Sequence, residues 1–200
     1  MMSNNTLLIF TRNLVYGKVK TRLSVTLGND KALSVYSLLV EHTAKIAKSV
    51  DAIRIVYYSE AIADEDTWDN TYLKTVQQGG DLGKRMANAF NENLKTGTKM
   101  VVIIGTDCYE LTGGIIADAF AQLEQHDVVI GPALDGGYYL LGMKVFHPEL
   151  FVDVAWSTPS VLKDTLSRCE SLTLNYFLLP VLSDIDEEKD LEHTDILDKL

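Results

Sequence analysis

The stretch "KMVVIIG" at residues 99–105 decides the fold class, because it is a short apolar run that ends in glycine. A run of this length between polar residues predicts a strand that is buried on both faces of a sheet. Apolar residues at helical spacing precede it over residues 82–94 and follow it over residues 115–123. We therefore expect this strand to lie between two helices, as in α/β proteins.

The same alternation runs through most of the chain. Further strands are expected at residues 6–11, 52–59, 72–78, 127–133, 136–143 and 173–182. Further helices are expected after Asp30 as N-cap, after Ser157 or Thr158 as cap with Pro159 at the first helical position, and over the acidic residues 186–200. This order predicts a single α/β domain over residues 1–200, with a mainly parallel sheet and helices on both of its faces.

The composition fits a globular protein and excludes some partners. The chain has 200 residues, 46% of them hydrophobic, and a formal net charge of −10. A nucleic-acid binder needs a broad basic face, so we expect no such partner, although a locally positive cleft can still bind a small anion. No apolar run reaches the roughly 20 residues that cross a bilayer, and residues 1–13 lack a secretory signal pattern. Cys108 and Cys169 show neither metal-ligand nor disulfide spacing. We expect no membrane partner and a cytoplasmic location.

Ligands of parallel sheets bind beyond the carboxyl ends of the strands, here the loops at residues 12–23, 78–84, 106–112 and 132–137. The first loop holds Arg12, Lys18, Lys20 and Arg22 around Gly17, whose backbone is conformationally free. These cations and the free N–H groups of the loop can hold phosphate oxygens. A solvated basic loop explains the same residues, and the GxxxxGK[ST] pattern of a P-loop is absent.

The stretch "QQGGDLGKRM" at residues 77–86 joins a glycine-rich loop to the start of a helix. Gln78 can hydrogen-bond a base or sugar edge. Lys84 and Arg85 can face a phosphate from the first helical turn, where the backbone favours anions. Asp81 is suited to cap that helix, and this capping role is compatible with ligand binding by its neighbours.

Two aspartates at strand ends are candidate metal ligands. Asp107 follows the strand at residues 99–105, and Asp186 follows the last strand. Mg²⁺ typically uses one or two carboxylates together with substrate phosphates, and Thr106 can add a contact. Each aspartate also has a structural explanation, a turn residue for Asp107 and a helix N-cap for Asp186, and both interpretations stay open here.

The stretch "GPALDGGYYL" at residues 131–140 places Asp135 before two glycines. Asp-Gly is a hairpin signal, so a tight turn between two strands is expected. Gly136 and Gly137 also let a ligand approach the backbone closely. A hairpin alone requires neither a neighbouring basic loop nor a second strand-end aspartate. Trp156 lies beside an expected helix cap, and since a tryptophan is more often a core residue than a ligand contact, we interpret it as a core residue.

Six stretches, in order, resemble a bacterial family of glycosyltransferase-A-like (GT-A) proteins. They are "FTRNLVYGKVKTRL", "QQGGDLGKRM", "IIGTDCYEL", "GPALDGGYYLLGM", "WSTPSVL" and "DIDEEKDL", and they span residues 7 to about 191. Members of this family are described as nucleotide-diphospho-sugar transferases, and some are named for arsenosugar biosynthesis. The resemblance implies the nucleotide-diphospho-sugar transferase (GT-A, Rossmann-like) fold, which is related to molybdenum-cofactor and phospholactate nucleotidyltransferases.

The resemblance also implies which residues bind the nucleotide donor and the metal ion. The residues that it assigns to the phosphates of a nucleotide are Lys18, Lys20 and Arg22, with Arg12 and Gly17 in the same loop. The residues that it assigns to the base or ribose are Gln78, Gly80 and Asp81. It implies Mg²⁺ or Mn²⁺ on Asp107, beside Thr106, with Asp186 as a second ligand.

On the acceptor side, the resemblance implies a lining of Asp135, Gly136, Gly137 and Tyr138, with Trp156, Ser157 and Thr158 nearby. In this scheme Asp135 orients or deprotonates the acceptor, and Lys20 and Arg22 stabilise charge on the leaving phosphate. The chain departs from the family at Leu14, Tyr16 and Tyr109, which stand where relatives usually carry prolines. These departures loosen the expected backbone of two loops.

The function implied is a metal-dependent transfer of a sugar from a nucleotide sugar to a small acceptor. The alternative is a nucleotidyltransferase that joins a nucleoside triphosphate to a small phosphorylated or acidic acceptor and releases pyrophosphate. A nucleotide-binding protein without catalysis is a third interpretation, to which the missing prolines give slight support. A Rossmann dehydrogenase is excluded, because no GxGxxG follows the first strand. The sequence does not indicate an oligomeric state.

Overall fold

A computed structural model describes residues 4–192 and 194–200 of the chain. Residues 1–3, part of the opening stretch without a secretory signal pattern, and residue 193, within the expected last helix, lie outside the described residues.

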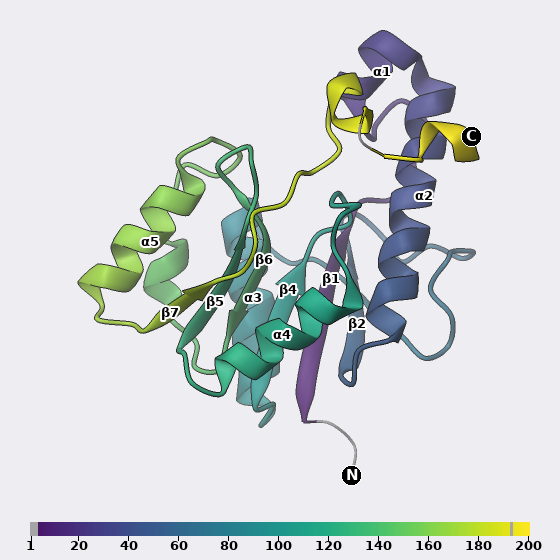
Figure 1. Ribbon diagram of the computed structural model, residues 1–200. Helices are drawn as coiled ribbons and strands as arrows, with labels where there is room; N and C mark the ends of the chain where they lie inside the picture. Colours follow the sequence, from purple (N-terminus) through teal and green to yellow (C-terminus); the bar gives the residue numbers. More distant parts are fainter. Residues whose placement is uncertain (1–3, 193) are drawn as a thin grey trace.

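The described chain is organised around a mixed sheet with the strand order β3-β2-β1-β4-β6-β5-β7 (Figure 1). The strands are β1 (Asn5–Thr11), β2 (Ile53–Tyr58), β3 (Leu73–Val76), β4 (Met100–Ile104), β5 (Val128–Pro132), β6 (Tyr138–Met143) and β7 (Tyr176–Leu178). All neighbouring strands pair in parallel except β6, which is antiparallel to both β4 and β5. The expectation of a mainly parallel sheet is therefore confirmed, and β5 and β6 form the expected hairpin.

Helices cover both faces of this sheet, as expected (Figure 1). The helices are α1 (Thr21–Leu27), α2 (Asn29–Lys48), α3 (Leu82–Lys95), α4 (Gly113–Leu123) and α5 (Val161–Ser171). Short 3-10 turns, η1 (Pro148–Phe151), η2 (Glu188–Leu191) and η3 (Leu197–Lys199), complete the described elements. Helices α2 and α4 pack on one face of the sheet, while α3, α5 and η1 pack on the other.

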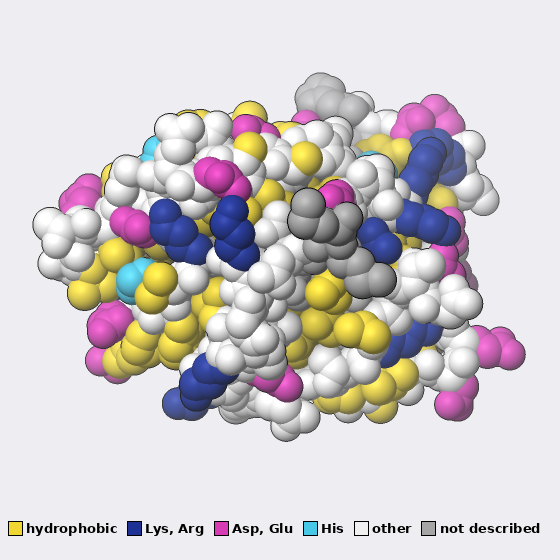
Figure 2. Space-filling view, turned by 90° about the horizontal axis from the view of Figure 1, so that it is seen from below, with side chains coloured by type: hydrophobic (Ala, Val, Ile, Leu, Met, Phe, Trp, Pro, Cys, Tyr) yellow, Lys and Arg dark blue, Asp and Glu magenta, His cyan; other side chains and the backbone are white. Residues whose placement is uncertain are grey.

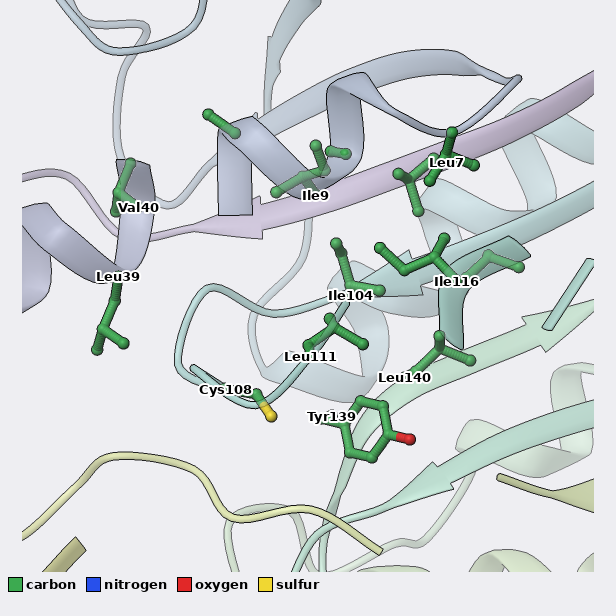
Figure 3. Packing of buried hydrophobic residues seen from close by; sticks show 14 of the residues in the cluster. Leu7, Ile9, Leu39, Val40, Ile104, Cys108, Leu111, Ile116, Tyr139 and Leu140 are labelled. Atoms are coloured by element: carbon green, nitrogen blue, oxygen red, sulfur yellow. The ribbon is translucent and has the colours of Figure 1, made fainter. Parts of the chain in front are cut away.

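The strands are apolar throughout because alternate residues enter two different core layers. On β1, Leu7 and Ile9 face α2 and α4, whereas Leu8 and Phe10 face α3 and α5. Figure 3 shows the first of these layers, with Leu7 and Ile9 beside side chains from β4, β6, α2 and α4. A strand buried on both faces reads as a continuous apolar run, which is why β1 and β4 were recognisable from the sequence.

Several helix boundaries differ from the expectation. Gly28, not Asp30, is the N-cap of α2, and Asp30 lies in the first turn. Helix α5 begins after Ser160, not after Ser157 or Thr158, because Ser157 has a left-handed backbone (φ 62°) and Thr158 donates its hydroxyl proton to the carbonyl of Ala155. The first loop is also shorter than expected, since α1 begins at Thr21.

The expected last helix over residues 186–200 is wrong in the part that the structure describes. This segment forms only the turns η2 and η3. The Asp190 carboxylate accepts hydrogen bonds from the backbone N–H groups of Asp186 (3.0 Å) and Glu187 (2.8 Å). Leu191 and Ile196 are buried, at a spacing that does not place them on one face of an α-helix. Local side-chain bonds therefore replace the helical ladder.

The face of the molecule at the amino end of β1 carries no continuous basic surface in the part of the chain that the structure describes. Figure 2 shows Lys and Arg side chains there interspersed with Asp, Glu and apolar residues. Among residues 4–192 and 194–200, no helix has the length and apolar character needed to cross a bilayer.

Replacing Leu123 with alanine tests the core layer under α4. Leu123 is fully buried, and Leu→Ala changes at such positions cost about 2–5 kcal/mol through lost burial and the cavity that remains. The matched control is Leu134→Ala, because Leu134 is 73% exposed and its loss should change the free energy of unfolding by less than about 0.5 kcal/mol. Urea denaturation measures both values, and equal losses would contradict the described packing.

Candidate active site

A pocket of ≈ 770 Å³ lies at the carboxyl ends of β1 and β4, where the strand order reverses direction. Its walls come from the end of β1 and the first loop, the start of α3, the loop after β4, the β5–β6 turn, residues 156–161 and residues 184–186. Parallel α/β sheets bind ligands at such a switch point. The strand-end loops chosen from the sequence therefore meet in one hollow.

The Lys20 ammonium lies at the centre of the charged part of this pocket. It forms ion pairs with Asp107 and with Asp186, the latter at 3.1 Å between Nζ and Oδ1. The Lys20 side chain is only 4% exposed, and its backbone is left-handed (φ 47°), just before α1 begins. Burial lowers the pKa of Lys20, but the carboxylates of Asp107 and Asp186 outweigh this effect, so the pKa is raised. Arg22 adds a longer contact, 3.6 Å from Nη1 to Asp186 Oδ2.

Backbone contacts bring the C-terminal segment to this point. Leu182 forms an isolated parallel β-bridge with Ala133, which lies in the turn after β5. The Ile185 N–H then donates to the carbonyl oxygen of Asp107 at 2.9 Å. These bonds fix Asp186 opposite Asp107, so two carboxylates that are far apart in the sequence share one cation.

Tyr36 on α2 connects the ends of β1 and β4. Its hydroxyl accepts a hydrogen bond from the Arg12 N–H (2.8 Å) and shares one with the Thr106 hydroxyl (2.9 Å). Burial, and then the charge of Asp107, raise the pKa of Tyr36, so the hydroxyl stays protonated. The sequence suggested only an apolar face for α2, and the hydroxyl's role could not be found from that pattern.

Asp184 is a further carboxyl group in the pocket, and the sequence analysis assigned it no role. Burial raises the pKa of Asp184 to about 7, and the nearby charge of Asp107 adds to the effect while Lys20 opposes it. Its position two residues before Asp186 is a signal, since strand-end carboxyl groups in this fold gather at one edge.

The β5–β6 turn packs against the segment that precedes α5. Asp135 Oδ1 accepts a hydrogen bond from the Gly137 N–H at 2.8 Å, so the turn interpretation of Asp135 is confirmed, and the side chain also lines the pocket. Gly136 has φ 88°, and an added Cβ would lie 2.2 Å from the Pro159 carbonyl oxygen. The turn therefore requires glycine at position 136 both for its backbone and for its contact.

Trp156 lies directly on the first turn of α3. A Cβ at Gly83 would be 2.0 Å from Trp156 Nε1, so only glycine permits this approach. The Trp156 ring also stacks on Phe151, with 6.3 Å between ring centroids. Trp156 is both a packing residue and part of the pocket wall.

The pocket brings together most of the residues chosen from the sequence, but not all of them. Those that line it are Arg12, Lys18, Lys20, Arg22, Thr106, Asp107, Asp135, Gly137, Tyr138, Trp156, Ser157, Thr158 and Asp186. Those outside its lining are Gly17, Gln78, Gly80, Asp81 and Gly136. Asp81 caps α3, as expected, by accepting from the Lys84 N–H at 2.7 Å.

The glutamine that lines the pocket is Gln77, not Gln78. Gln77 Nε2 donates to the carbonyl oxygens of Thr11 (3.3 Å) and Tyr57 (2.9 Å). Its Oε1 accepts from Arg85 Nη1 at 3.3 Å, and Arg85 also lines the pocket. Both glutamines follow the end of β3, and neighbouring residues of extended chain face opposite sides, so the sequence alone does not reveal which of them faces the pocket.

The carboxylates of this pocket suit a divalent cation that has other ligands as well. Among the described residues, no group of three or more His, Cys, Asp or Glu is arranged to hold a metal ion. Asp107 and Asp186 do converge on one ammonium group. Two carboxylates with room for phosphate oxygens form the usual protein share of a magnesium site.

Comparisons with known proteins agree with this geometry. The family described as "Uncharacterized protein conserved in bacteria (DUF2064)" matches residues 42–158. A candidate nucleotide-diphospho-sugar transferase from Desulfovibrio desulfuricans G20 has 28% sequence identity and a TM-score of 0.90, over 99% of this chain and 95% of that chain. None of the curated proteins matches this chain.

Two more distant structures share the fold. A cytidylyltransferase from Leptospira borgpetersenii serovar Hardjo-bovis (strain JB197) has 15% identity and a TM-score of 0.57, over 95% of this chain and 84% of that chain. Rv0371c from Mycobacterium tuberculosis H37Rv, solved in complex with manganese, has 11% identity and a TM-score of 0.53, over 98% and 99% of the two chains.

The fold and the strand-end pocket define a protein of the GT-A-like class, and the resemblance drawn from the six sequence stretches is confirmed. The chain belongs to the DUF2064 family, which matches more than half of its length. The expectation of an enzyme is confirmed by the likeness to the transferase structure from Desulfovibrio desulfuricans G20.

Tyr36→Phe tests the connection between the ends of β1 and β4. Tyr36 is 1% exposed, and without its hydroxyl the part-buried Arg12 N–H and the buried Thr106 hydroxyl lose a partner. We expect a loss of about 1–3 kcal/mol in the free energy of unfolding. The matched control is Tyr16→Phe, at a side chain that is 59% exposed, and denaturant titration should show almost no change there. An unchanged stability in Tyr36→Phe would refute the role of the hydroxyl.

Asp184→Asn tests the buried carboxyl group through the pH dependence of stability. The pKa of Asp184 is about 7 in the folded protein and near 3.8 in the unfolded chain. Above pH 3.8 the unfolded chain releases the proton first, so wild-type stability falls as pH rises towards 7. The variant should be more stable than the wild type by about 1–3 kcal/mol at pH 7 and equal to it near pH 4. Asp51→Asn, at an exposed position, is the control, and a variant curve parallel to the wild-type curve would contradict the burial effect.

Proposed function

We propose that this protein transfers a glycosyl group from a nucleotide sugar to a small acceptor with the help of a divalent metal ion. The observation that carries the proposal is the convergence of Lys20, Asp107 and Asp186 in one pocket at the switch point of the sheet. A basic loop for a diphosphate and two carboxylates for a metal are what this chemistry requires. The proposal includes a single transferase domain over residues 1–200 and a cytoplasmic location.

The diphosphate of the donor is assigned to the basic side of the pocket. Arg12, Lys18, Lys20 and Arg22 come from the end of β1 and the segment that follows it, and Arg85 comes from the first turn of α3. Cations and helix N-termini both favour phosphate oxygens. Lys20 and Arg22 would stabilise the charge that develops on the leaving nucleoside diphosphate.

Mg²⁺ or Mn²⁺ would be held by Asp107 and Asp186 beside the diphosphate, where it would offset the charge of the phosphates. The two carboxylates agree with this role as metal ligands, because both already face one cationic group, the Lys20 ammonium. A manganese complex of a distant structure with this fold adds support. The base or ribose is assigned to the loop that holds Gln78, Gly80 and Asp81, which lies outside the pocket lining, and Gln77 is the residue of this loop that lines the pocket.

On the acceptor side, Asp135 is the candidate for the proton transfer. An acceptor hydroxyl oxygen would form the new bond to the anomeric carbon, and the bond from that carbon to the diphosphate oxygen would break. The nucleoside diphosphate would leave with the bonding electron pair, and the hydroxyl proton would pass to the carboxylate of Asp135. Only one oxygen of Asp135 accepts from the Gly137 N–H, which leaves the other oxygen for an acceptor.

Nucleotidyl transfer is the second candidate, supported by the similarity of the fold to a cytidylyltransferase. The same basic loop and carboxylates would bind a nucleoside triphosphate, and the leaving group would be pyrophosphate. Product analysis separates the two reactions, because glycosyl transfer releases a nucleoside diphosphate.

A thermal-shift panel of nucleoside diphosphates, triphosphates and nucleotide sugars tests the proposal, with and without Mg²⁺ or Mn²⁺. A ligand present at about 1,000 times its dissociation constant should stabilise the fold by roughly 4 kcal/mol. In Asp107→Ala the metal should no longer strengthen nucleotide binding, whereas in Asp118→Ala, a surface change on α4, it should act as in the wild type. Absence of stabilisation by every nucleotide would refute the proposed function. A metal effect that persists in Asp107→Ala would remove this residue as a ligand.

A further inference from the structure

The cations that line the pocket all come from one part of the chain. Every Lys and Arg of the lining belongs to residues 12–85, namely Arg12, Lys18, Lys20, Arg22 and Arg85. From residue 103 onwards, the described part of the lining contains no Lys, Arg or His. Asp186 reaches these cations, since it pairs with Lys20 and Arg22, but the side formed by the β5–β6 turn, residues 156–161 and Asp184 contributes no cation of its own to a ligand.

This second side combines apolar surface with carboxyl groups. Trp156, Tyr138 and Val161 supply the apolar surface, and Leu82 and Met86 of α3 line the same pocket. Trp156 is held in place by Gly83 and Phe151, and aromatic rings that are fixed in this way form good contacts with apolar ligand surface. Asp135 and Asp184 add carboxyl groups to this side.

The cations that line the pocket are assigned to the diphosphate of the donor, so they are not available to an acceptor, and two of them already have partners in the protein. Lys20 pairs with Asp107 and Asp186 and has a side chain that is only 4% exposed. Arg85 donates to the Gly79 carbonyl oxygen and to Gln77 Oε1. An anionic group on the acceptor would lose water without gaining a partner, and an unpaired charge of this kind is costly to bury.

We propose that the acceptor is a non-anionic alcohol, uncharged or cationic, with an apolar portion that lies against Trp156 and Tyr138. This inference rests on the proposed transfer reaction and specifies its second substrate class. It excludes the phosphorylated or acidic acceptor of the nucleotidyl-transfer alternative. A cation would be favoured further by Asp135 and by the face of the Trp156 ring.

The experiment divides a bacterial small-molecule extract on an anion exchanger at pH 7 into retained anions and a flow-through of neutral and cationic compounds. Each fraction is added to the full-length protein with Mn²⁺ and the nucleotide sugar that stabilises it most strongly, and consumption of the nucleotide sugar is followed by mass spectrometry. We expect the flow-through to stimulate consumption at least about tenfold more than the retained anions, because an unpaired anion costs more than the 1.4 kcal/mol that corresponds to tenfold. Equal or greater stimulation by the retained anions overturns the inference.

Two variants test whether the acceptor binds against the side of the pocket that contains Trp156 and Thr158. Trp156→Ala should raise the acceptor concentration needed for half-maximal consumption, with little change in the thermal shift caused by the nucleotide sugar, because the donor binds on the basic side. Thr158→Lys places a cation on the acceptor side and should increase stimulation by the retained anions relative to the wild type. Loss of the nucleotide-induced thermal shift in the wild-type protein would instead count against the proposed function, so the two failures are distinguishable. The assignment of the acceptor to this side would be refuted by two results together. Trp156→Ala would need the same acceptor concentration as the wild type, and Thr158→Lys would show no greater stimulation by the retained anions.

Discussion

The ion pairs of Lys20 with Asp107 and Asp186 are the constraint on which the rest of the pocket depends. Each carboxylate would repel the other if no cation lay between them, and the buried ammonium group would lose part of the compensation for its lost hydration if either carboxylate were absent. The three groups come from the first loop, the end of β4 and the C-terminal segment. Their mutual attraction thus holds three parts of the chain around a space that is otherwise open to solvent.

The antiparallel strand β6 explains why the pocket has two chemically different sides. A wholly parallel sheet would place only carboxyl ends of strands, and the loops that follow them, at this edge. Because β6 runs in the opposite direction, the turn that contains Asp135 lies beside the ends of β1 and β4. The turn then packs on the Pro159 backbone and brings Trp156 and its neighbours to the same edge. One reversed strand is therefore sufficient to add apolar and acidic side chains to a pocket whose other loops are basic.

The parts of this structure that could be predicted from the sequence are those that local patterns determine. Continuous apolar runs revealed β1 and β4 because both faces of each strand are buried, and the glycines after Asp135 revealed the hairpin. The prediction of a last helix was wrong because the Asp190 carboxylate accepts the backbone N–H groups at the start of that segment. Gln77 and Gln78 could not be distinguished, because the side chain of Gln77 is oriented by backbone carbonyl groups of β1 and β2, which are distant in the sequence. The roles of Tyr36 and Asp184 depend on neighbours that are distant in the sequence, which no local pattern contains.

The path of the C-terminal segment has a consequence for the synthesis of the protein. Lys20 and Asp186 are 166 positions apart, and Asp186 is synthesised after all the strands of the described sheet. Most of the sheet can therefore form before residue 186 is made, but the charged centre of the pocket cannot. A nascent chain would expose Asp107 and Lys20 without their third partner, so this three-residue cluster should assemble only after residue 186 has left the ribosome.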